Sequence, residues 1–513
     1  MITFIVALVV LVVGYVLYGT FVEKIFGIDP KAETPAITKN DGVDFVPMSG
    51  WRIFLVQFLN IAGLGPIFGA IMGIFFGPAA FLWIVFGTIF AGGVHDYLSG
   101  MLSLRKGGVS LPEIVGSELG SGIRVFMRVL SLVLLLLLTT TFLSGPATLL
   151  QGLAPLSTLP FHGRALPIAW LLIIFAYYAM ATVLPVDKLI GRFYPIFGAM
   201  LLFMGVGIAV VMLTQHGSAM PELTDGLQNR KADGLPLFPM MFVSIACGAI
   251  SGFHGTQSPI MSRCLTNERQ GRWIFYGAMV AEGILALIWA AAAGTFFADP
   301  EQGLDGIGGL QAFASHYDRG TNLPALIVDK VSRSWLGTVG GVLAIIGVIA
   351  APITSGDTAL RSARLIVADF LHIDQKPKMK RLMIALPLFL CVFALVFVNF
   401  EIVWRYFSWT NQTLAMFTLW AGTVWLYKNG RRHSSSATNS LPLREGSGVG
   451  FGYLIALIPA LFMTMVSTSY ILIAPEGFSL PEQYRWIGYA VAGVITLACL
   501  CGFTFWAKNY KAK

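Results

Sequence analysis

Long apolar segments recur along the whole chain and are separated by short polar stretches. Most reach the roughly 20 residues that a helix needs to cross the hydrocarbon core of a bilayer, so the pattern predicts about thirteen membrane-spanning helices. The first segment has no basic stretch before it and no convincing cleavage site after it, and we expect it to be a retained helix. The predicted spans lie near residues 2–21, 53–76, 79–103, 125–147, 165–185, 190–213, 238–263, 272–297, 335–370, 381–400, 403–427, 450–473 and 485–506.

The charge content and its placement support this topology. Only 12% of the 513 residues are charged and 56% are hydrophobic, whereas soluble proteins carry about 25% charged residues. The basic residues lie in the connections between apolar segments, which argues against nucleic-acid binding. With the N-terminus outside, most of the 34 Lys and Arg residues fall in segments predicted to be cytoplasmic, as the positive-inside rule requires, and the C-terminus is cytoplasmic.

Motifs of several enzyme classes are absent from the sequence. There is no Gly-Lys pair for a phosphate-binding loop, no His-Glu-x-x-His zinc motif and no Gly-x-Ser-x-Gly motif. The five cysteines lie mostly in apolar segments without metal-ligand spacing, so we expect small buried hydrophobes rather than disulfides or a metal site. No resident cofactor is expected, and these absences argue against an enzyme.

Two predicted spans carry glycine and proline deep within the membrane. One contains Asn60-Ile-Ala-Gly-Leu-Gly-Pro66, and the other contains Ser251-Gly-Phe-His-Gly-Thr-Gln-Ser-Pro259. Gly and Pro weaken a helix, and the freed backbone groups must face protein or water rather than lipid. The second span runs in the opposite sense to the first, as in a five-plus-five inverted repeat whose broken helices bind substrate and ion. The alternative is that these residues only permit close helix packing.

Ionisable side chains at membrane depth are few, and their cost suggests a function. His254 lies in the second predicted break, and we expect it to bind substrate or transfer a proton. His95 and Asp96 could take part in coupling or form a buried structural pair. Glu282 interrupts an apolar run and could act in coupling or belong to a packing network.

A second group of candidates offers oxygen ligands for a coupling ion. The hydroxyl groups of Thr354 and Ser355, with carbonyl groups freed near Ala62 and Gly65, could bind Na⁺. Such hydroxyls more often bond back to their own helix. Asp357 lies in the same segment and permits proton coupling, unless it pairs with a basic residue one turn later. H⁺ and Na⁺ therefore both stay open as coupling ions.

At these segments the sequence resembles the carbon starvation protein family, CstA. The resemblance covers most of the chain, from the N-terminus to about residue 430. It implies an inner-membrane secondary carrier related to the amino acid-polyamine-organocation superfamily, associated with uptake of pyruvate and small peptides during nutrient starvation and with suspected proton coupling. The chain is shorter than the best-known members, which carry more C-terminal sequence. The matching segments are Asn60 to Pro66, Gly92 to Tyr97, Ser251 to Pro259, Ile353 to Ala359 and Trp409-Thr-Asn-Gln-Thr413.

The predicted architecture is an all-α polytopic membrane protein. It has a LeuT-like five-plus-five inverted repeat with two broken helices, one extra N-terminal helix and two extra C-terminal helices. The predicted parts are an N-terminal helix with a cytoplasmic connector (1–50), the first repeat (51–215), the second repeat (216–428) with an outer loop (298–334), a cytoplasmic linker (429–448) and two C-terminal helices (449–513).

We expect a secondary transporter of the bacterial inner membrane that imports a small carboxylate-bearing nutrient, with H⁺ favoured over Na⁺ as the coupling ion. Its expected partners are this solute and the lipid bilayer, and the oligomeric state is open. A membrane-embedded enzyme, a channel and a nutrient sensor are the alternatives. The predicted substrate-binding residues are Asn60, Gly63, Gly65, His254, Gln257, Ser258, Asn411 and Gln412. The predicted coupling residues are Ala62, Thr354, Ser355, Asp357, His95, Asp96 and Glu282.

Overall fold

The computed structural model describes residues 1–42, 44–153, 165–183, 186–231, 233–297, 306–316, 322–373, 375, 377–435 and 451–510. Within these residues the regular secondary structure is entirely helical. Short π-helical segments at Tyr15–Gly19 and Gly87–Gly92 join neighbouring α-helices into longer ones, and a third, Arg272–Tyr276, connects a 3₁₀ turn to the α-helix that begins at Gly277. The predicted all-α architecture is confirmed for the described part of the chain.

The α-helices follow one another in two long series. The first comprises α1 (Ile2–Gly14), α2 (Thr20–Phe26), α3 (Pro35–Thr38), α4 (Gly50–Ile61), α5 (Gly65–Ile74), α6 (Ala79–Phe86), α7 (Gly93–Arg105), α8 (Leu111–Leu119), α9 (Ser121–Leu153), α10 (Ala165–Val183) and α11 (Val186–Gln215). The second comprises α12 (Leu237–Ser244), α13 (Gly252–Ser262), α14 (Gly277–Phe296), α15 (Gly306–Ser315), α16 (Leu323–Leu371), α17 (Lys378–Leu395), α18 (Phe400–Ser435), α19 (Leu454–Ile473) and α20 (Arg485–Asn509).

Eight of the described helices are long and apolar enough to cross a membrane, or nine if the bent pair α4–α5 is one span. This is fewer than the thirteen spans predicted, although most of the described residues in each predicted segment are helical. The difference has local causes. The segment near 238–263 divides into α12 and α13, and α17 begins with three basic residues within four positions. The middle of α18 is rich in Ser, Thr, Asn and Gln, and the described apolar part of α10, Ile168–Ala181, is short.

The first predicted break is present in the structure. α4 ends at Ile61 and α5 begins at Gly65, and the two helices meet at an angle of 45°. Pro66 occupies the first turn of α5, where its missing N–H costs no helical hydrogen bond. Close packing accompanies the break, because a Cβ on Gly65 would overlap with the side chain of Cys247. The two alternatives posed by the sequence, a broken backbone and close helix packing, therefore occur together.

The second break lies earlier in the chain than predicted. The interruption runs from Ile245 to Ser251, between α12 and α13, whereas most of the predicted range Ser251–Pro259 lies inside α13. Gly248 explains this position, because a Cβ there would lie 2.5 Å from the Cβ of Ala286 on α14. The backbone passes so close to α14 that a side chain at this point would not fit. The proline that suggested a later break is accommodated within α13.

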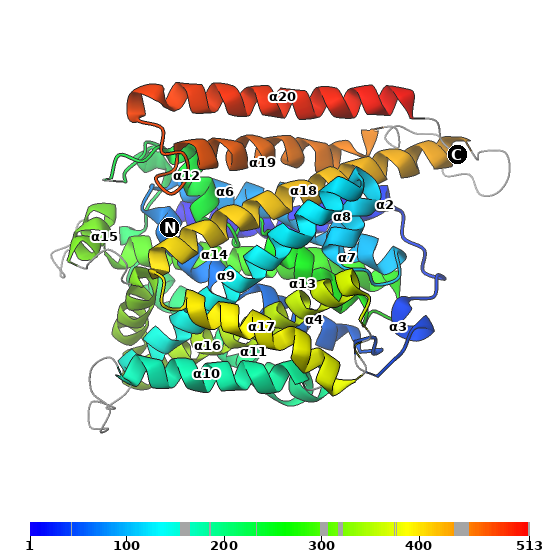
Figure 1. Ribbon diagram of the computed structural model, residues 1–513. Helices are drawn as coiled ribbons and strands as arrows, with labels where there is room; N and C mark the ends of the chain where they lie inside the picture. Colours follow the sequence, from blue (N-terminus) through cyan, green and yellow to red (C-terminus); the bar gives the residue numbers. More distant parts are fainter. Residues whose placement is uncertain are drawn as a thin grey trace.

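The helices pack as a bundle in which the two breaks are neighbours. In Figure 1, α20 lies along one edge of the bundle beside α19, while α10 lies at the opposite edge. Near the breaks, α5 packs against both α12 and α14, and α16 packs against α9 and α11. The broken segments are thus enclosed by other helices, as freed backbone groups in a membrane require.

Two predicted connections are only partly described. α15 and the start of α16 occupy much of the predicted outer loop, whose residues 298–305 and 317–321 lie outside the described residues. α18 continues to Ser435, so the first residues of the predicted linker are helical, and residues 436–448 lie outside the described part.

Candidate functional site

Four buried ionisable side chains contact one another in the interior of the bundle. Asp96 on α7 is at the centre: its Oδ1 lies 2.8 Å from Nδ1 of His95, and its Oδ2 lies 2.9 Å from Nδ1 of His254 on α13. On its other side, Nε2 of His254 lies 3.2 Å from Oε2 of Glu282 on α14. All four side chains have 0% exposed surface. The structure thus brings together the four ionisable residues predicted on three separate segments, here called the His–Asp–His–Glu chain.

The four side chains of the His–Asp–His–Glu chain differ in how many of their polar atoms have hydrogen-bond partners. Both oxygens of Asp96 face a histidine nitrogen, as a buried carboxylate requires. Neither carboxylate oxygen of Glu282 has a hydrogen-bond partner among the described residues, because the 3.2 Å approach to His254 lacks hydrogen-bond geometry. Nε2 of His95 has no such partner there either. Two imidazoles that alternate with two carboxylates form a set of groups that can hold a proton at several positions. No group of three or more His, Cys, Asp or Glu in the described part could hold a metal ion.

Two local features position the residues of the His–Asp–His–Glu chain. Asp96 closely follows the π-helical segment Gly87–Gly92 within the continuous helix Ala79–Arg105, and His254 lies in the first turn of α13, directly after the second break. α7 can approach the break because Gly92, just before it, has no side chain: a Cβ there would overlap with the carbonyl oxygen of Ala249. Glu282 belongs to α14, which packs against α5 and α7, and its side chain approaches His254 from that helix.

Asn411 and Gln412 on α18, predicted as substrate contacts, form hydrogen bonds with the backbone around the second break. Oδ1 of Asn411 accepts hydrogen bonds from the backbone N–H of Phe253 at 2.7 Å and from Oγ of Ser251 at 3.1 Å. Nε2 of Gln412 lies 3.3 Å from the carbonyl oxygen of Phe242 and 3.4 Å from that of Ile250. These two side chains satisfy backbone groups at both ends of the break, a role that the sequence pattern did not reveal.

Gln257 and Ser258 on α13 connect that helix to two others. Nε2 of Gln257 donates to Oγ of Ser362 on α16 at 3.1 Å. Oγ of Ser258 accepts from Nε2 of Gln57 on α4 at 3.2 Å. Gln57 was not among the predicted residues, although a fully buried amide inside an apolar segment is a usable signal. Both predicted substrate residues therefore have protein partners in this structure.

The predicted ion-coupling residues on α16 lie against the first break. Thr354 donates to the carbonyl of Ala351 on its own helix at 2.7 Å, which is the alternative expected for such hydroxyls. Oγ of Ser355 reaches α4 as well, at 3.2 Å from the carbonyl oxygen of Leu59, and a Cβ on Gly63 would lie 3.1 Å from it. Tyr178 of α10 packs against Gly356 of this segment and was not among the predicted residues.

The remaining predicted residues are enclosed near the same break. Asn60, Ala62 and Asp357 are buried, and Oδ1 of Asp357 has no hydrogen-bond partner among the described residues. Every predicted substrate or coupling residue is buried. The predicted site therefore divides into the His–Asp–His–Glu chain with the second break and a group between α4 and α16, both closed to solvent in this structure.

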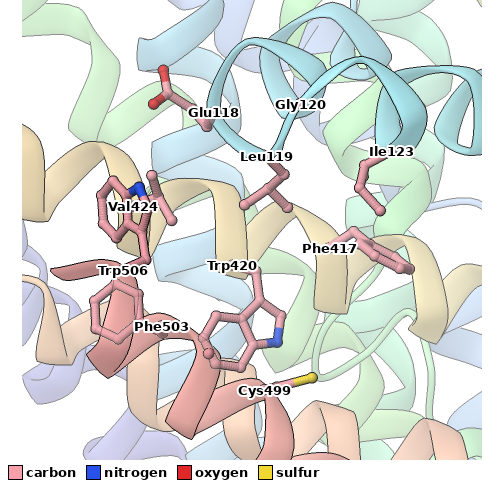
Figure 2. Close-up of a pocket in the computed structure, with 11 residues that line it drawn as sticks. Glu118, Leu119, Gly120, Ile123, Phe417, Trp420, Val424, Cys499, Phe503 and Trp506 are labelled. Atoms are coloured by element: carbon pink, nitrogen blue, oxygen red, sulfur yellow. The ribbon is translucent and has the colours of Figure 1, made fainter. Parts of the chain in front are cut away.

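A pocket of about 560 Å³ lies elsewhere, between α8, α18 and α20. Figure 2 shows Trp420, Phe503 and Trp506 along its apolar wall and Glu118 at one end. None of its lining residues belongs to the predicted site. This pocket opens beside the peripheral helix α20, so it is not the enclosed site described above.

The fold is that of membrane transporters. The chain superposes on the manganese transporter of Eremococcus coleocola, solved in complex with an aromatic bis-isothiourea substituted compound, with a TM-score of 0.54 over 91% of this chain and 98% of that chain at 13% sequence identity. It superposes on MhsT, solved in complex with L-phenylalanine, with a TM-score of 0.57 over 82% of this chain and 99% of that chain at 16% identity. Both neighbours have the LeuT fold, so this chain is a multi-span helical membrane protein of the LeuT-fold class.

The chain belongs to the CstA family. The family model described as carbon starvation protein CstA matches residues 1–159 and 157–303. An uncharacterized membrane protein of Haemophilus influenzae is 46% identical over 60% of this chain and 94% of its own length. The pyruvate/proton symporter BtsT of Escherichia coli is 28% identical over 62% of this chain and 53% of its own length. The peptide transporter CstA of Campylobacter jejuni is 30% identical over 55% of this chain and 48% of its own length. The chain thus spans about half the length of these two transporters.

Proposed function

We propose that this protein is a proton-coupled secondary transporter that imports a small carboxylate-bearing solute, pyruvate or a small peptide. Support comes from the CstA family and from relatives named as a pyruvate/proton symporter and as peptide transporters. The proposal includes the predicted topology of about thirteen spans with two inverted five-helix repeats, an outer N-terminus and a cytoplasmic C-terminus in the bacterial inner membrane.

The His–Asp–His–Glu chain is the observation that carries the proposal. Buried charges without partners are costly, so a proton that enters this group redistributes the pairing of its neighbours. His254 is the central link, because it faces Asp96 of α7 and Glu282 of α14 through its two ring nitrogens. It also lies in the first turn after the break. Protonation of Glu282 would remove the negative charge opposite His254 and weaken the hold of α14 on α13, which couples the proton to movement of a broken helix.

The breaks also supply a site for a solute carboxylate. The N-terminal ends of α5 and α13 lie in the interior and carry partial positive charge, which favours a carboxylate. The Na⁺-coupled alternative rests on Ser355, whose hydroxyl lies 3.2 Å from the carbonyl oxygen of Leu59 beside the first break. Replacement of a Na⁺ gradient by a pH gradient distinguishes these two coupling ions.

Transport by the purified full chain in proteoliposomes tests the proposal. Labelled pyruvate and a labelled dipeptide are supplied outside, with and without an inward proton gradient, and the internal solute is identified by mass. We expect saturable, gradient-stimulated uptake of one of them in unchanged form. Glu282→Gln should lose the stimulation by the gradient and keep exchange of solute across the membrane. Glu482→Gln, at a side chain that is 86% exposed, is the matched control and should behave as the wild type.

Four results would contradict the proposal. Wild-type protein that takes up neither solute removes this substrate class. Chemical conversion of the solute indicates an enzyme, and non-saturating downhill flux indicates a channel. Full gradient stimulation in Glu282→Gln removes the His–Asp–His–Glu chain from the coupling step.

A further inference from the structure

Arg364 is a fully buried arginine near the C-terminal end of α16, the end predicted to face the cytoplasm. Its side chain has 0% exposed surface. It lies seven residues beyond Asp357, which corresponds to about 10 Å along the helix axis. A guanidinium stays charged at physiological pH and carries five N–H donors. A buried guanidinium is stable only where these donors and the charge find partners.

One nitrogen of Arg364 has an acceptor among the described residues, and the other two do not. Nη1 donates to the side-chain oxygen of Gln375. Nε and Nη2 have no hydrogen-bond partner in the described part of the chain. Oδ1 of Asp44 lies 3.9 Å from Nη2, beyond hydrogen-bond length, and Oδ1 has no hydrogen-bond partner there either. Asp44 thus balances the charge of Arg364 without satisfying its donors.

The two nitrogens form one edge of the guanidinium. Nε and Nη2 carry parallel N–H bonds that match the spacing of the two oxygens of a carboxylate. Asp44 approaches from the Nη2 side of this edge. The edge is therefore suited to an acceptor that is planar, anionic and bidentate.

The surroundings of Arg364 carry an excess of positive charge. Arg263, Arg361 and Arg381 are also buried, with 6% exposed surface or less, and all three interact electrostatically with Arg364. The charges of Asp44 and Asp357 act on Arg364, and that of Asp369 acts on Arg263. Four arginines against these three carboxylates leave a net positive charge among these described groups, which favours a further anion.

This region adjoins the predicted substrate site. Oγ of Ser362, two residues before Arg364, accepts the hydrogen bond from Gln257 at 3.1 Å, and it lies 3.3 Å from the carbonyl oxygen of Thr256. α13 and α16 are therefore joined directly beside the arginine. Arg364 therefore lies two residues along α16 from a direct contact with the helix that carries the predicted substrate-binding residues Gln257 and Ser258.

We propose that the Nε–Nη2 edge of Arg364 binds the carboxylate of a small organic anion, which takes the place of Asp44 as its counter-ion. This inner anion site deepens the proposed function and rests on it, because it assigns the carboxylate of the transported solute a second binding position. Binding in two steps would let the solute exchange one set of donors for another as it crosses the protein.

Equilibrium binding tests this site without any gradient. Radiolabelled pyruvate is titrated into the purified full chain in detergent, and acetate or inorganic phosphate is added as a competitor. In Arg364→Lys, which keeps the charge but loses the bidentate edge, one binding component should weaken about 10- to 100-fold. In Asp44→Asn, which removes the competing carboxylate, the same component should strengthen. Arg333→Lys is the matched control on the same helix, at a partly exposed arginine paired with Asp329, and should bind as the wild type.

Each outcome bears on the proposal. Equal pyruvate affinity in the wild type, Arg364→Lys and Asp44→Asn overturns it, as does the absence of pyruvate binding by the wild type. Stronger competition by phosphate than by acetate overturns the assignment to a carboxylate. If Arg364→Lys does not fold, Asp44→Asn alone decides. Failure of uptake in proteoliposomes together with Arg364-dependent binding contradicts the proposed function and leaves the anion site standing.

Discussion

Asn411 provides a direct test of how the second break is stabilised. Its side-chain oxygen accepts from the backbone N–H of Phe253 and from the hydroxyl of Ser251, and the residue has 0% exposed surface. In Asn411→Ala the N–H of Phe253 loses its acceptor in a place where water cannot replace it. The sequence pattern suggested instead that Asn411 contacts the substrate, so one substitution separates the two roles.

The size of the effect follows from these two hydrogen bonds. A buried donor left without an acceptor costs about 1–3 kcal/mol, and a typical hydrogen bond contributes about 0.5–1.5 kcal/mol. We therefore expect Asn411→Ala to lower the free energy of unfolding by about 3 kcal/mol. Asn399 is the matched control, because its oxygen accepts from the N–H of Glu401 at 2.8 Å in an exposed position. Water can replace that acceptor, so Asn399→Ala should cost about 1 kcal/mol, as for an ordinary helix cap.

Denaturant titration of the two purified variants in detergent measures this difference, and uptake kinetics are recorded alongside. The interpretation predicts a large loss of stability in Asn411→Ala and a small one in Asn399→Ala. If the two variants lose the same stability, the capping role of Asn411 is wrong. If Asn411→Ala keeps its stability while the KM for solute rises, Asn411 contacts the substrate as the sequence pattern suggested.

Two further predictions concern stability away from the His–Asp–His–Glu chain. A Cβ on Gly65 would overlap with Cys247, so Gly65→Ala should lower the free energy of unfolding by about 1–3 kcal/mol in the same titration. Gly122→Ala is the control and should be neutral or stabilising, because a Cβ there has nothing within 4 Å. Equal effects of the two substitutions would refute the close packing of the breaks. Burial raises the pKa of Glu118, but hydrogen bonds from Lys106 and Lys428 outweigh it and hold the pKa below its ordinary value. Its stabilising contribution is then present above the ordinary pKa of 4.5 and is lost as pH falls through the lowered pKa. Glu118→Gln should therefore have a lower melting temperature than the wild type at pH 7, and the difference between the two melting temperatures should shrink in acid. A difference that grows in acid would show that the two lysines do not hold the pKa of Glu118 down.

Features that depend on a few adjacent residues could be predicted from the sequence. The first break follows from glycines and a proline in succession, and the structure places it at Ala62 to Leu64. The ionisable residues of the His–Asp–His–Glu chain were found because charge is rare in apolar segments. The position of the second break was wrong by several residues, because it depends on the approach of Gly248 to α14, a contact between distant parts of the chain.

Partnerships between helices could not be predicted in the same way. The pattern suggested that Asp96 pairs with the adjacent His95, yet the structure adds His254 on its other oxygen, from a residue 158 positions away. Asn411 and Gln412 have the composition of a binding motif, but which backbone groups lack partners becomes known only once α18 is packed on the break. Gln57 and Tyr178 were missed for the same reason, since a single polar side chain in an apolar segment says nothing about what it meets.

The positions of these partners constrain how any transport step can proceed. Asn411 holds the start of α13, Gln257 ties that helix to α16, and His254 faces both Asp96 and Glu282. α13 is therefore fixed on several sides by polar contacts in a closed structure, and a rotation of α13 that opens one of these contacts strains the others. In the proposed transport cycle, a proton at the His–Asp–His–Glu chain and a carboxylate at the start of α13 would both act on the same short helix. Coupling between them would then require no long pathway, because both ligands would change the contacts of a single broken element.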